Sequence, residues 1–121
     1  MKIRIYYEDT DAGGIVYHTN YLKYCERARS EIFFAKGKTP TDGDKSGFVV
    51  SHIDANFLGM AKLGDMLEVK SKVLEERKAS VVLKQTIFKD KTKIFEMSVT
   101  LVFVRDGRPK AIPKDLQNFF K

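Results

Sequence analysis

A single helical segment followed by a nearly continuous series of strands is the feature that most limits how this chain can fold. Within residues 19–36, apolar side chains recur at the spacing of one helix face. A helix with such a stripe needs a surface to cover it, and the remaining sequence has to supply that surface. The members of the stripe, at positions i, i+4, i+7 and i+11, are Tyr21, Cys25, Ala28 and Ile32.

Signals at both ends support the bounds of this helix. Thr19 or Asn20 can supply an N-cap oxygen, and Gly37 suits the left-handed residue that follows a helix. The next residues, 38–47, are rich in Pro, Gly and Asp and predict a loop. We expect Tyr24, Phe33 and Phe34 to widen the apolar face, and the polar face to carry Lys23, Glu26, Arg27, Arg29 and Glu31.

The rest of the chain alternates between apolar and polar residues, which is the period of strands. In residues 94–105, IFEMSVTLVFVR, every second side chain from Phe95 to Phe103 is apolar. Turn signals such as LGD and DGRP separate these segments. The predicted strands are residues 2–7, 47–58, 65–74, 80–88 and 94–105, with Ile3, Ile5 and Tyr7 on one side of the first.

These elements predict an α+β fold in which a curved antiparallel sheet wraps one long helix. Sheet and helix can bury each other's apolar faces within a single domain, residues 1–121. Such a protomer leaves a sheet edge unpaired, and a second copy of the chain can pair with it. We therefore expect a homo-oligomer.

The chain has a formal net charge of +6, from 22 basic and 16 acidic residues. This excess fits an anionic partner, but the basic residues are scattered among acids, which favours a role in solubility. No aromatic and basic motif for nucleic-acid recognition is present. No apolar run approaches the ~20 residues that cross a bilayer, and the first residues lack the apolar stretch of a signal peptide. The single cysteine cannot form an internal disulfide, which fits a reducing compartment. We expect a cytoplasmic protein.

The stretch EDTDAGGIVYHTNY, residues 8–21, combines three acids, two glycines and a helix start. Asp11 precedes Ala-Gly-Gly, and Gly13 and Gly14 let a ligand or another backbone come close. A carboxylate in this place can act as a general base, attack a carbonyl directly, or accept backbone N–H bonds in a turn. The spacing alone favours the turn.

The helix start adds a second chemical feature. Backbone N–H groups of the first turn, from about His18 to Tyr21, carry partial positive charge and can stabilise a developing oxyanion. A carboxylate and an oxyanion-binding N–H a few residues apart are two parts that acyl transfer needs. The His18 side chain itself can act as an acid or base, or can pack at the helix start.

Other candidate residues have simpler interpretations. The two histidines and one cysteine lie far apart without metal-ligand spacing, so no metal is expected. Cys25 on the apolar stripe predicts a buried, inert thiol, and His52 within a strand predicts a structural residue. Arg77, Lys78 and Lys110 lie at or beside turns, where they can bind phosphates or be solvated.

The segment RIYYEDTDAGGIVYHTNYLKYCERARSE, residues 4–31, closely resembles the signature of the hot-dog-fold acyl-CoA thioesterases of the 4-hydroxybenzoyl-CoA thioesterase type, most of all their YbgC branch. The resemblance continues at FVV (48–50), at LGDMLEV (63–69) and through the strands to about Val104. It implies a hot-dog fold, dimers or tetramers that join their sheets, and active sites at the subunit interface. It implies no metal or redox cofactor. CoA takes part as a portion of the substrate.

The resemblance also implies roles for individual residues. Asp11 is implied to be the catalytic carboxylate, either a nucleophile or a general base. The backbone N–H at His18 is implied to polarise the thioester carbonyl, with the Tyr7 and His18 side chains assisting. Gly13 and Gly14 would let the chain pass close to the thioester. The residues implied to hold the CoA phosphates are Arg77 and Lys78, with Lys110 a weaker match.

We therefore expect an acyl-CoA thioesterase that hydrolyses short- to medium-chain acyl-CoA, with acyl carrier protein as a further candidate partner. Met60 stands where the family commonly has a proline, so the acyl-chain preference is left open. One alternative is a non-catalytic module that binds acyl-CoA or acyl carrier protein in phospholipid metabolism. A nucleic-acid-binding domain is another alternative, and the basic balance is its one support.

Overall fold

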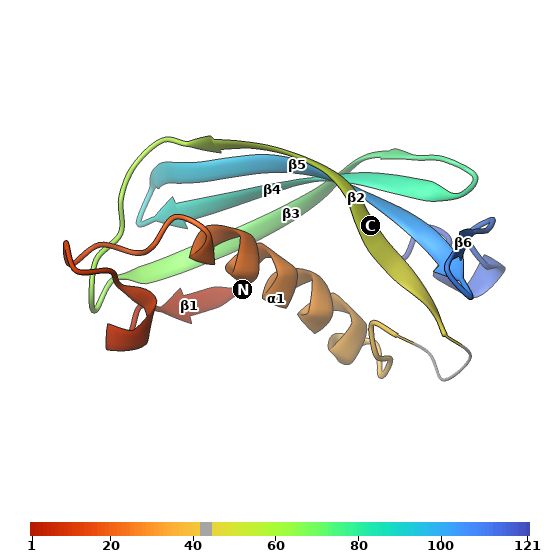
Figure 1. The fold of residues 1–121 in the computed structure, drawn as a ribbon, viewed down its shortest axis with the longest axis horizontal. Coiled ribbons are helices and arrows are strands. Elements are labelled where there is room, and N and C mark those ends of the chain that lie inside the picture. Colours follow the sequence, from red (N-terminus) through yellow and green to blue (C-terminus); the bar gives the residue numbers. More distant parts are fainter. Residues whose placement is uncertain (42–44) are drawn as a thin grey trace.

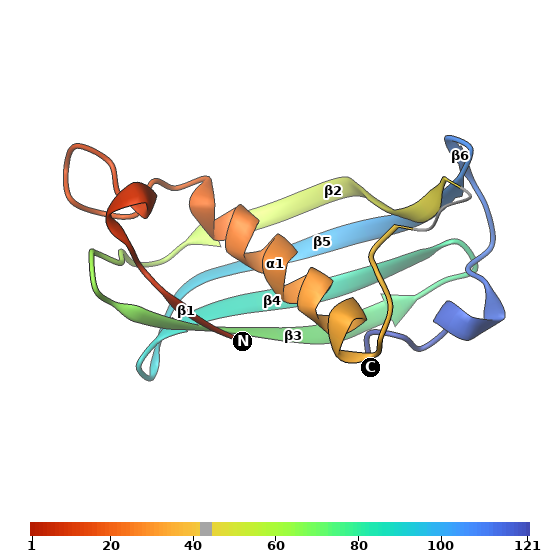
Figure 2. The same ribbon diagram turned by 90° about the horizontal axis from the view of Figure 1, so that it is seen from below.

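One long helix lies across the concave face of a curved antiparallel sheet, as Figures 1 and 2 show from two sides. The computed structural model describes residues 1–41 and 45–121, so the predicted loop at residues 38–47 lies partly outside the described residues. In the described part of the chain the sheet order is β1-β3-β4-β5-β2, and β6 pairs with β5. The elements are β1 (Lys2–Arg4), the 3-10 turn Tyr7–Asp9, α1 (Asn20–Ala35), β2 (Ser46–Phe57), β3 (Met66–Glu76), β4 (Ser80–Lys89), β5 (Thr92–Arg105), β6 (Arg108–Pro109) and the 3-10 turn Lys114–Leu116. The predicted α+β architecture is confirmed.

The helix and the inner face of the sheet bury each other as the two periods predict. Three members of the helix stripe are buried, and Ile32 is half-buried. Covering each large apolar side chain contributes about 2 kcal/mol to this contact. The predicted inward residues of β5 are all buried, namely Phe95, Met97, Val99, Leu101 and Phe103.

The C-terminal end of α1 follows the sequence signal, and the N-terminal end does not. Gly37 adopts φ +72° and closes the helix as predicted. Thr19 is the N-cap residue but makes no capping bond through its side chain. The Asn20 side-chain amide, through Nδ2, donates to the Asp9 carbonyl oxygen at 2.9 Å. The predicted side-chain cap is therefore wrong, because Asn20 ties the helix to the preceding loop instead.

The first strand ends earlier than predicted, at Arg4. The Tyr6 N–H donates to Asp9 Oδ2 at 2.8 Å and opens a 3-10 turn, which takes the chain out of the sheet. Tyr7 is therefore 83% exposed. Its predicted place on the buried side of the strand, in line with Ile3, is wrong.

Two residues of α1 differ from the prediction in their burial. Arg29, expected on the polar face, is half-buried and donates to Oε1 of Gln85 at 2.8 Å. Gln85 is fully buried on β4, and its Nε2 donates to the Cys25 carbonyl and to Ser71 Oγ, both at 3.0 Å. A polar side chain at an inward strand position thus draws Arg29 toward the sheet. Phe34, expected in the apolar face, is half exposed.

The last residues of the chain return to the core, which the sequence patterns did not predict. Phe119 and Phe120 are both buried. The Phe119 ring lies 4.5 Å from that of Phe33 on α1, and the Phe120 ring lies 5.5 Å from that of Phe48 on β2. The Lys36 ammonium donates to the Phe119 carbonyl oxygen. The tail therefore closes the space between the end of α1 and the sheet.

We expect Phe119→Ala to lower the free energy of unfolding by about 3 kcal/mol, because it leaves a cavity beside the rings of Phe33 and Phe120. Phe34→Ala removes the same side chain from an exposed site on α1 and should cost about 0.5 kcal/mol. Urea unfolding of both variants measures the difference. Equal losses would contradict the place of the tail in the core.

Candidate active site

Residues 10–16, here called the 10–16 hairpin, form a small two-stranded loop that carries Asp11. Thr10 and Val16 form an antiparallel bridge. The Asp11 N–H donates to the Ile15 carbonyl oxygen at 2.9 Å, and the Gly14 N–H donates to the Asp11 carbonyl oxygen at 3.0 Å. Gly14 has φ +81°, a conformation that side chains other than glycine rarely adopt. The backbone around Asp11 is therefore fixed on both sides of the residue.

The Asp11 carboxylate is exposed and half engaged. Its Oδ1 accepts the Gly13 N–H at 2.8 Å, which is the turn contact that the spacing favours. A Cβ atom on residue 13 would lie 3.2 Å from that oxygen, so glycine leaves room for the carboxylate. Within residues 1–41 and 45–121, no donor bonds the second oxygen. One carboxylate oxygen thus remains open to a substrate or a water molecule.

The start of α1 presents two open amides a few residues further on. The Asn20 N–H donates to the Tyr17 carbonyl at 2.9 Å and the Tyr21 N–H to the His18 carbonyl at 3.4 Å, so these two of the predicted free donors are occupied. Among the described residues, no acceptor bonds the amides of His18 and Thr19. They carry the positive end of the helix dipole.

The His18 side chain is exposed and lies among aromatic rings. Its ring centroid is 4.6 Å from that of Tyr17 and 6.0 Å from that of Phe57 at the end of β2. Tyr7 belongs to the same region through its backbone, because its carbonyl accepts the Thr10 hydroxyl at 2.9 Å. Tyr7, Asp11 and His18 therefore gather at one end of the molecule.

The turn between β3 and β4, which carries Arg77 and Lys78, and the segment after β6, which begins at Lys110, lie at the other end of the sheet from the 10–16 hairpin (Figure 1). The Lys78 carbonyl accepts the Ile112 N–H at 2.8 Å, which brings the segment after β6 beside the turn between β3 and β4. Arg77 is exposed and pairs with Glu75 at 2.8 Å. Within one protomer, the structure does not bring these basic residues to Asp11.

A second segment, residues 61–65, supports the hairpin. The sequence predicts only a turn within it, at LGD, residues 63–65. The Val16 N–H donates to the Ala61 carbonyl at 2.9 Å, and Ile15 forms a bridge with Lys62. The Tyr21 hydroxyl, at the start of α1, accepts the Ala61 N–H at 3.2 Å. The 61–65 segment therefore holds both the hairpin and the helix start.

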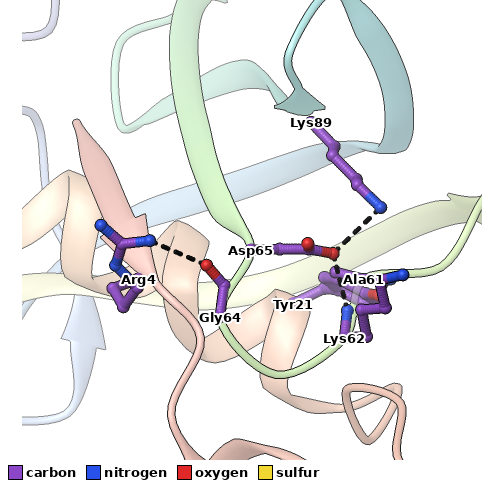
Figure 3. A network of polar contacts seen from close by, with 7 residues as sticks. All are labelled: Arg4, Tyr21, Ala61, Lys62, Gly64, Asp65 and Lys89. Atoms are coloured by element: carbon purple, nitrogen blue, oxygen red, sulfur yellow. Dashed lines mark hydrogen bonds and ion pairs between the residues drawn. The ribbon is translucent and has the colours of Figure 1, made fainter.

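Asp65 closes this segment, as Figure 3 shows. Its Oδ2 accepts the Lys62 N–H at 2.9 Å and lies 3.0 Å from the Lys89 ammonium. Arg4 donates to the Gly64 carbonyl at 2.8 Å. Partial burial opposes ionisation of Asp65, but the bonds from Lys62 and Lys89 outweigh it and lower the pKa of this carboxyl. The LGD sequence indicates the turn, but the partner on β4 follows only from the fold.

The remaining chemical candidates are accounted for within the part of the chain that the structure describes. No group of three His, Cys, Asp or Glu side chains there is placed to hold a metal ion, and no helix there is long and apolar enough to cross a membrane. His52 lies exposed on β2. Cys25 is fully buried, as its place on the stripe predicts.

Comparison with known proteins matches the thioesterase superfamily model to residues 13–96. A Helicobacter pylori protein described as acyl-CoA thioesterase YbgC is 43% identical over 94% of this chain and 93% of its own length. The Escherichia coli O6:H1 acyl-CoA thioester hydrolase YbgC is 34% identical over 98% of this chain and 92% of its own length. Among solved structures, a probable thioesterase from Bartonella henselae superposes with a TM-score of 0.86 at 29% identity, over 93% of this chain and 97% of its own.

Burial raises the pKa of the Cys25 thiol to about 12, well above its ordinary value, so we expect an unreactive thiol in the folded protein. At about pH 8.5, iodoacetamide should alkylate the native protein at least ~100-fold more slowly than the urea-unfolded protein. Mass spectrometry reads this directly, because the chain has one cysteine. Similar rates in both states would show that the thiol is accessible.

Proposed function

Because this chain belongs to the thioesterase superfamily, has its hot-dog fold and is an acyl-CoA thioesterase, we propose that it hydrolyses short- to medium-chain acyl-CoA with Asp11 as the catalytic carboxylate. The observation that carries the proposal is the pairing of an open carboxylate oxygen on Asp11 with open amides at His18 and Thr19. Acyl transfer needs a group that attacks or activates water and a donor for the oxyanion.

The chemistry can follow either of two routes. In the first, an Asp11 oxygen attacks the thioester carbonyl carbon, the C–S bond breaks, CoA leaves as the thiolate, and water then cleaves the mixed anhydride. In the second, Asp11 takes a proton from a water molecule that attacks the same carbon, the C–S bond breaks, and CoA leaves as the thiolate, which takes up a proton as the free acid is released. In both routes the His18 amide donates to the carbonyl oxygen as negative charge develops there. The side chains of His18 and Tyr7 assist from positions beside the hairpin.

A second copy of the chain is part of the proposal. β2 is an outer strand of 12 residues, and in the described residues its far edge has no strand partner beyond the isolated bridge of Gly47 with Thr41. Its inner face leaves Val50, Ile53 and Phe57 exposed by 45%, 38% and 50%. A long apolar edge of this kind is suited to pairing with another chain. We propose a homodimer joined along β2, from which a tetramer can be built.

Antiparallel pairing along β2 also accounts for the separation of the basic residues. A two-fold axis beside β2 places one end of a protomer next to the opposite end of its partner. Arg77, Lys78 and Lys110 of one copy would then lie toward the Asp11 end of the other, where they can bind CoA phosphates. The same positive charge suits acyl carrier protein as an alternative source of the acyl thioester. Met60, 68% exposed beside Ala61, is a candidate wall for the acyl chain.

The first test is hydrolysis of a panel of acyl-CoA thioesters by the wild type and by Asp11→Asn. The substitution keeps the size of the side chain and its bond to Gly13 but removes the charge and nucleophilicity. We expect the variant to lose at least ~100-fold in rate, as expected for loss of a general base or nucleophile. The panel also gives the chain-length preference.

The other outcomes of this test are informative. Equal activity of wild type and variant would exclude Asp11 as the catalytic group. If both proteins bind acyl-CoA or acyl carrier protein but turn over neither thioester, the chain is a binding module. Single turnover in oxygen-18 water separates the two routes, because label enters Asp11 only if its carboxylate attacks.

The dimer predicts a specific effect of a charge on β2. Ile53→Glu should shift the protein toward a monomer in sedimentation velocity, because it places an unpaired charge in the apolar edge. Leu74→Glu is the matched control, since Leu74 is 51% exposed on β3, away from that edge. A shift in both variants, or in neither, would contradict an interface along β2.

A further inference from the structure

We propose that Asp65, through its ion pair with Lys89, is a positioning residue that sets the place of the Asp11 carboxylate. Asp65 lies outside the 10–16 hairpin and touches none of its residues by a hydrogen bond or ion pair. It acts through the 61–65 segment, which lies between them. This inference rests on the proposed role of Asp11.

The first step is the anchor of Asp65 on the sheet. Lys89 is the last residue of β4, and its ammonium lies 3.0 Å from Asp65 Oδ2. The side chains are 33% and 15% exposed, so water screens this pair less than the more exposed pairs of Arg77 with Glu75 and Lys38 with Asp115. The same Oδ2 accepts the Lys62 N–H at 2.9 Å. One carboxylate oxygen therefore joins the turn to the end of a core strand.

The second step is the turn itself. Gly64 has φ +88°, its N–H donates to the Ile5 carbonyl, and the Ile5 N–H donates to the Asp65 carbonyl, each at 2.9 Å. Arg4 adds a bond to the Gly64 carbonyl (Figure 3). The turn is thus fixed to the chain just after β1. Within it, Asp65 holds Lys62 by two bonds: the Lys62 carbonyl accepts the Asp65 N–H at 3.0 Å, and the Lys62 N–H donates to Asp65 Oδ2 at 2.9 Å. The second bond is the one that depends on the Asp65 side chain.

The third step runs from the 61–65 segment to the catalytic carboxylate. Ala61 and Lys62 pair with Val16 and Ile15 of the hairpin. The Ile15 carbonyl accepts the Asp11 N–H at 2.9 Å, directly across the hairpin. A rotation of Lys62 therefore moves Ile15, and Ile15 moves the backbone of Asp11. Displacement of a catalytic group by about 1 Å can lower the rate by up to ~100-fold.

The helix start is held by the same segment through a separate contact. The Tyr21 hydroxyl accepts the Ala61 N–H at 3.2 Å, so Ala61 bonds both the hairpin and α1. The 61–65 segment therefore holds both the hairpin with its carboxylate and the helix start with its amides. Asp65 is the charged side chain that fixes this piece to β4.

The test compares Asp65→Asn, Lys89→Met and Lys89→Arg. Asp65→Asn keeps an oxygen for the Lys62 N–H but removes the charge. Lys89→Met removes the charge from the other partner while keeping its length, and Lys89→Arg restores it. Glu96→Gln is the control, because Glu96 pairs with Lys84 at 3.6 Å and Lys93 at 3.2 Å on the same sheet, away from the hairpin.

Two readouts separate positioning from simple stabilisation. In acyl-CoA hydrolysis, we expect Asp65→Asn and Lys89→Met to lower kcat by about 10-fold with KM changed by less than about twofold. Lys89→Arg should recover most of the kcat that Lys89→Met loses, and Glu96→Gln should match the wild type. In hydrogen exchange, peptides that cover residues 10–17 should exchange faster in the first two variants than in Glu96→Gln.

An unchanged kcat and unchanged exchange of residues 10–17 in Lys89→Met would overturn the inference, and this variant decides if Asp65→Asn does not fold. A lower melting temperature with unchanged kcat in Lys89→Met would show that the ion pair stabilises the fold without positioning Asp11, and would also overturn the inference. The activities of the wild type and of Asp11→Asn show whether a negative result concerns this inference or the proposed function. If the wild type is active and Asp11→Asn is not, a null result for Lys89→Met counts against Asp65 alone. If the wild type turns over no thioester, the proposed function fails while the exchange data still report on the hairpin.

Discussion

Burial of α1 by the inner face of the sheet is the contact on which the rest of the structure depends. The helix presents Tyr21, Cys25 and Ala28 to strands whose inward residues are almost all apolar. Apolar contact is non-directional, and it would allow the helix to slide or rotate on the sheet. Gln85 removes this freedom, because its amide bonds the Cys25 carbonyl and its oxygen accepts the Arg29 guanidinium. The position of the helix start, and of its open amides, follows from this polar contact in the core.

The sequence was sufficient for the elements that rest on periodicity, and insufficient where a distant polar partner decides. The helix and the four long strands end within about two residues of the predicted bounds, a normal margin. Arg29 was misplaced because its partner lies 56 residues further along the chain. Tyr7 was misplaced because the Asp9 carboxylate competes for the Tyr6 N–H and ends the strand. The buried tail was missed because two adjacent phenylalanines carry no period.

The same distinction holds for the candidate site. Asp11 and the helix start lie within ten residues of each other, so their proximity could be predicted from the local sequence. The support beneath them could not, because Ala61 and Lys62 meet the hairpin, and Lys89 meets Asp65, only after β1, β3 and β4 have paired. The LGD turn signal marks the position of Asp65 but says nothing of Lys89. The sequence thus predicts which of these groups lie close together locally, and the paired sheet determines which residues hold them in place.

The exposure of the site constrains how it can work. In bulk water an exposed amide gains little by donating to an oxyanion, because water makes the same bonds and the dielectric constant is high. Asp11 and the His18 amide are both exposed in the single chain, so a cover that excludes water would strengthen each of them. β2 ends at Phe57, beside the His18 ring, and its apolar inner face runs away from that point. In the proposed dimer, a second copy along β2 would cover the site as it buries its own edge, and assembly and catalysis would then depend on the same surface.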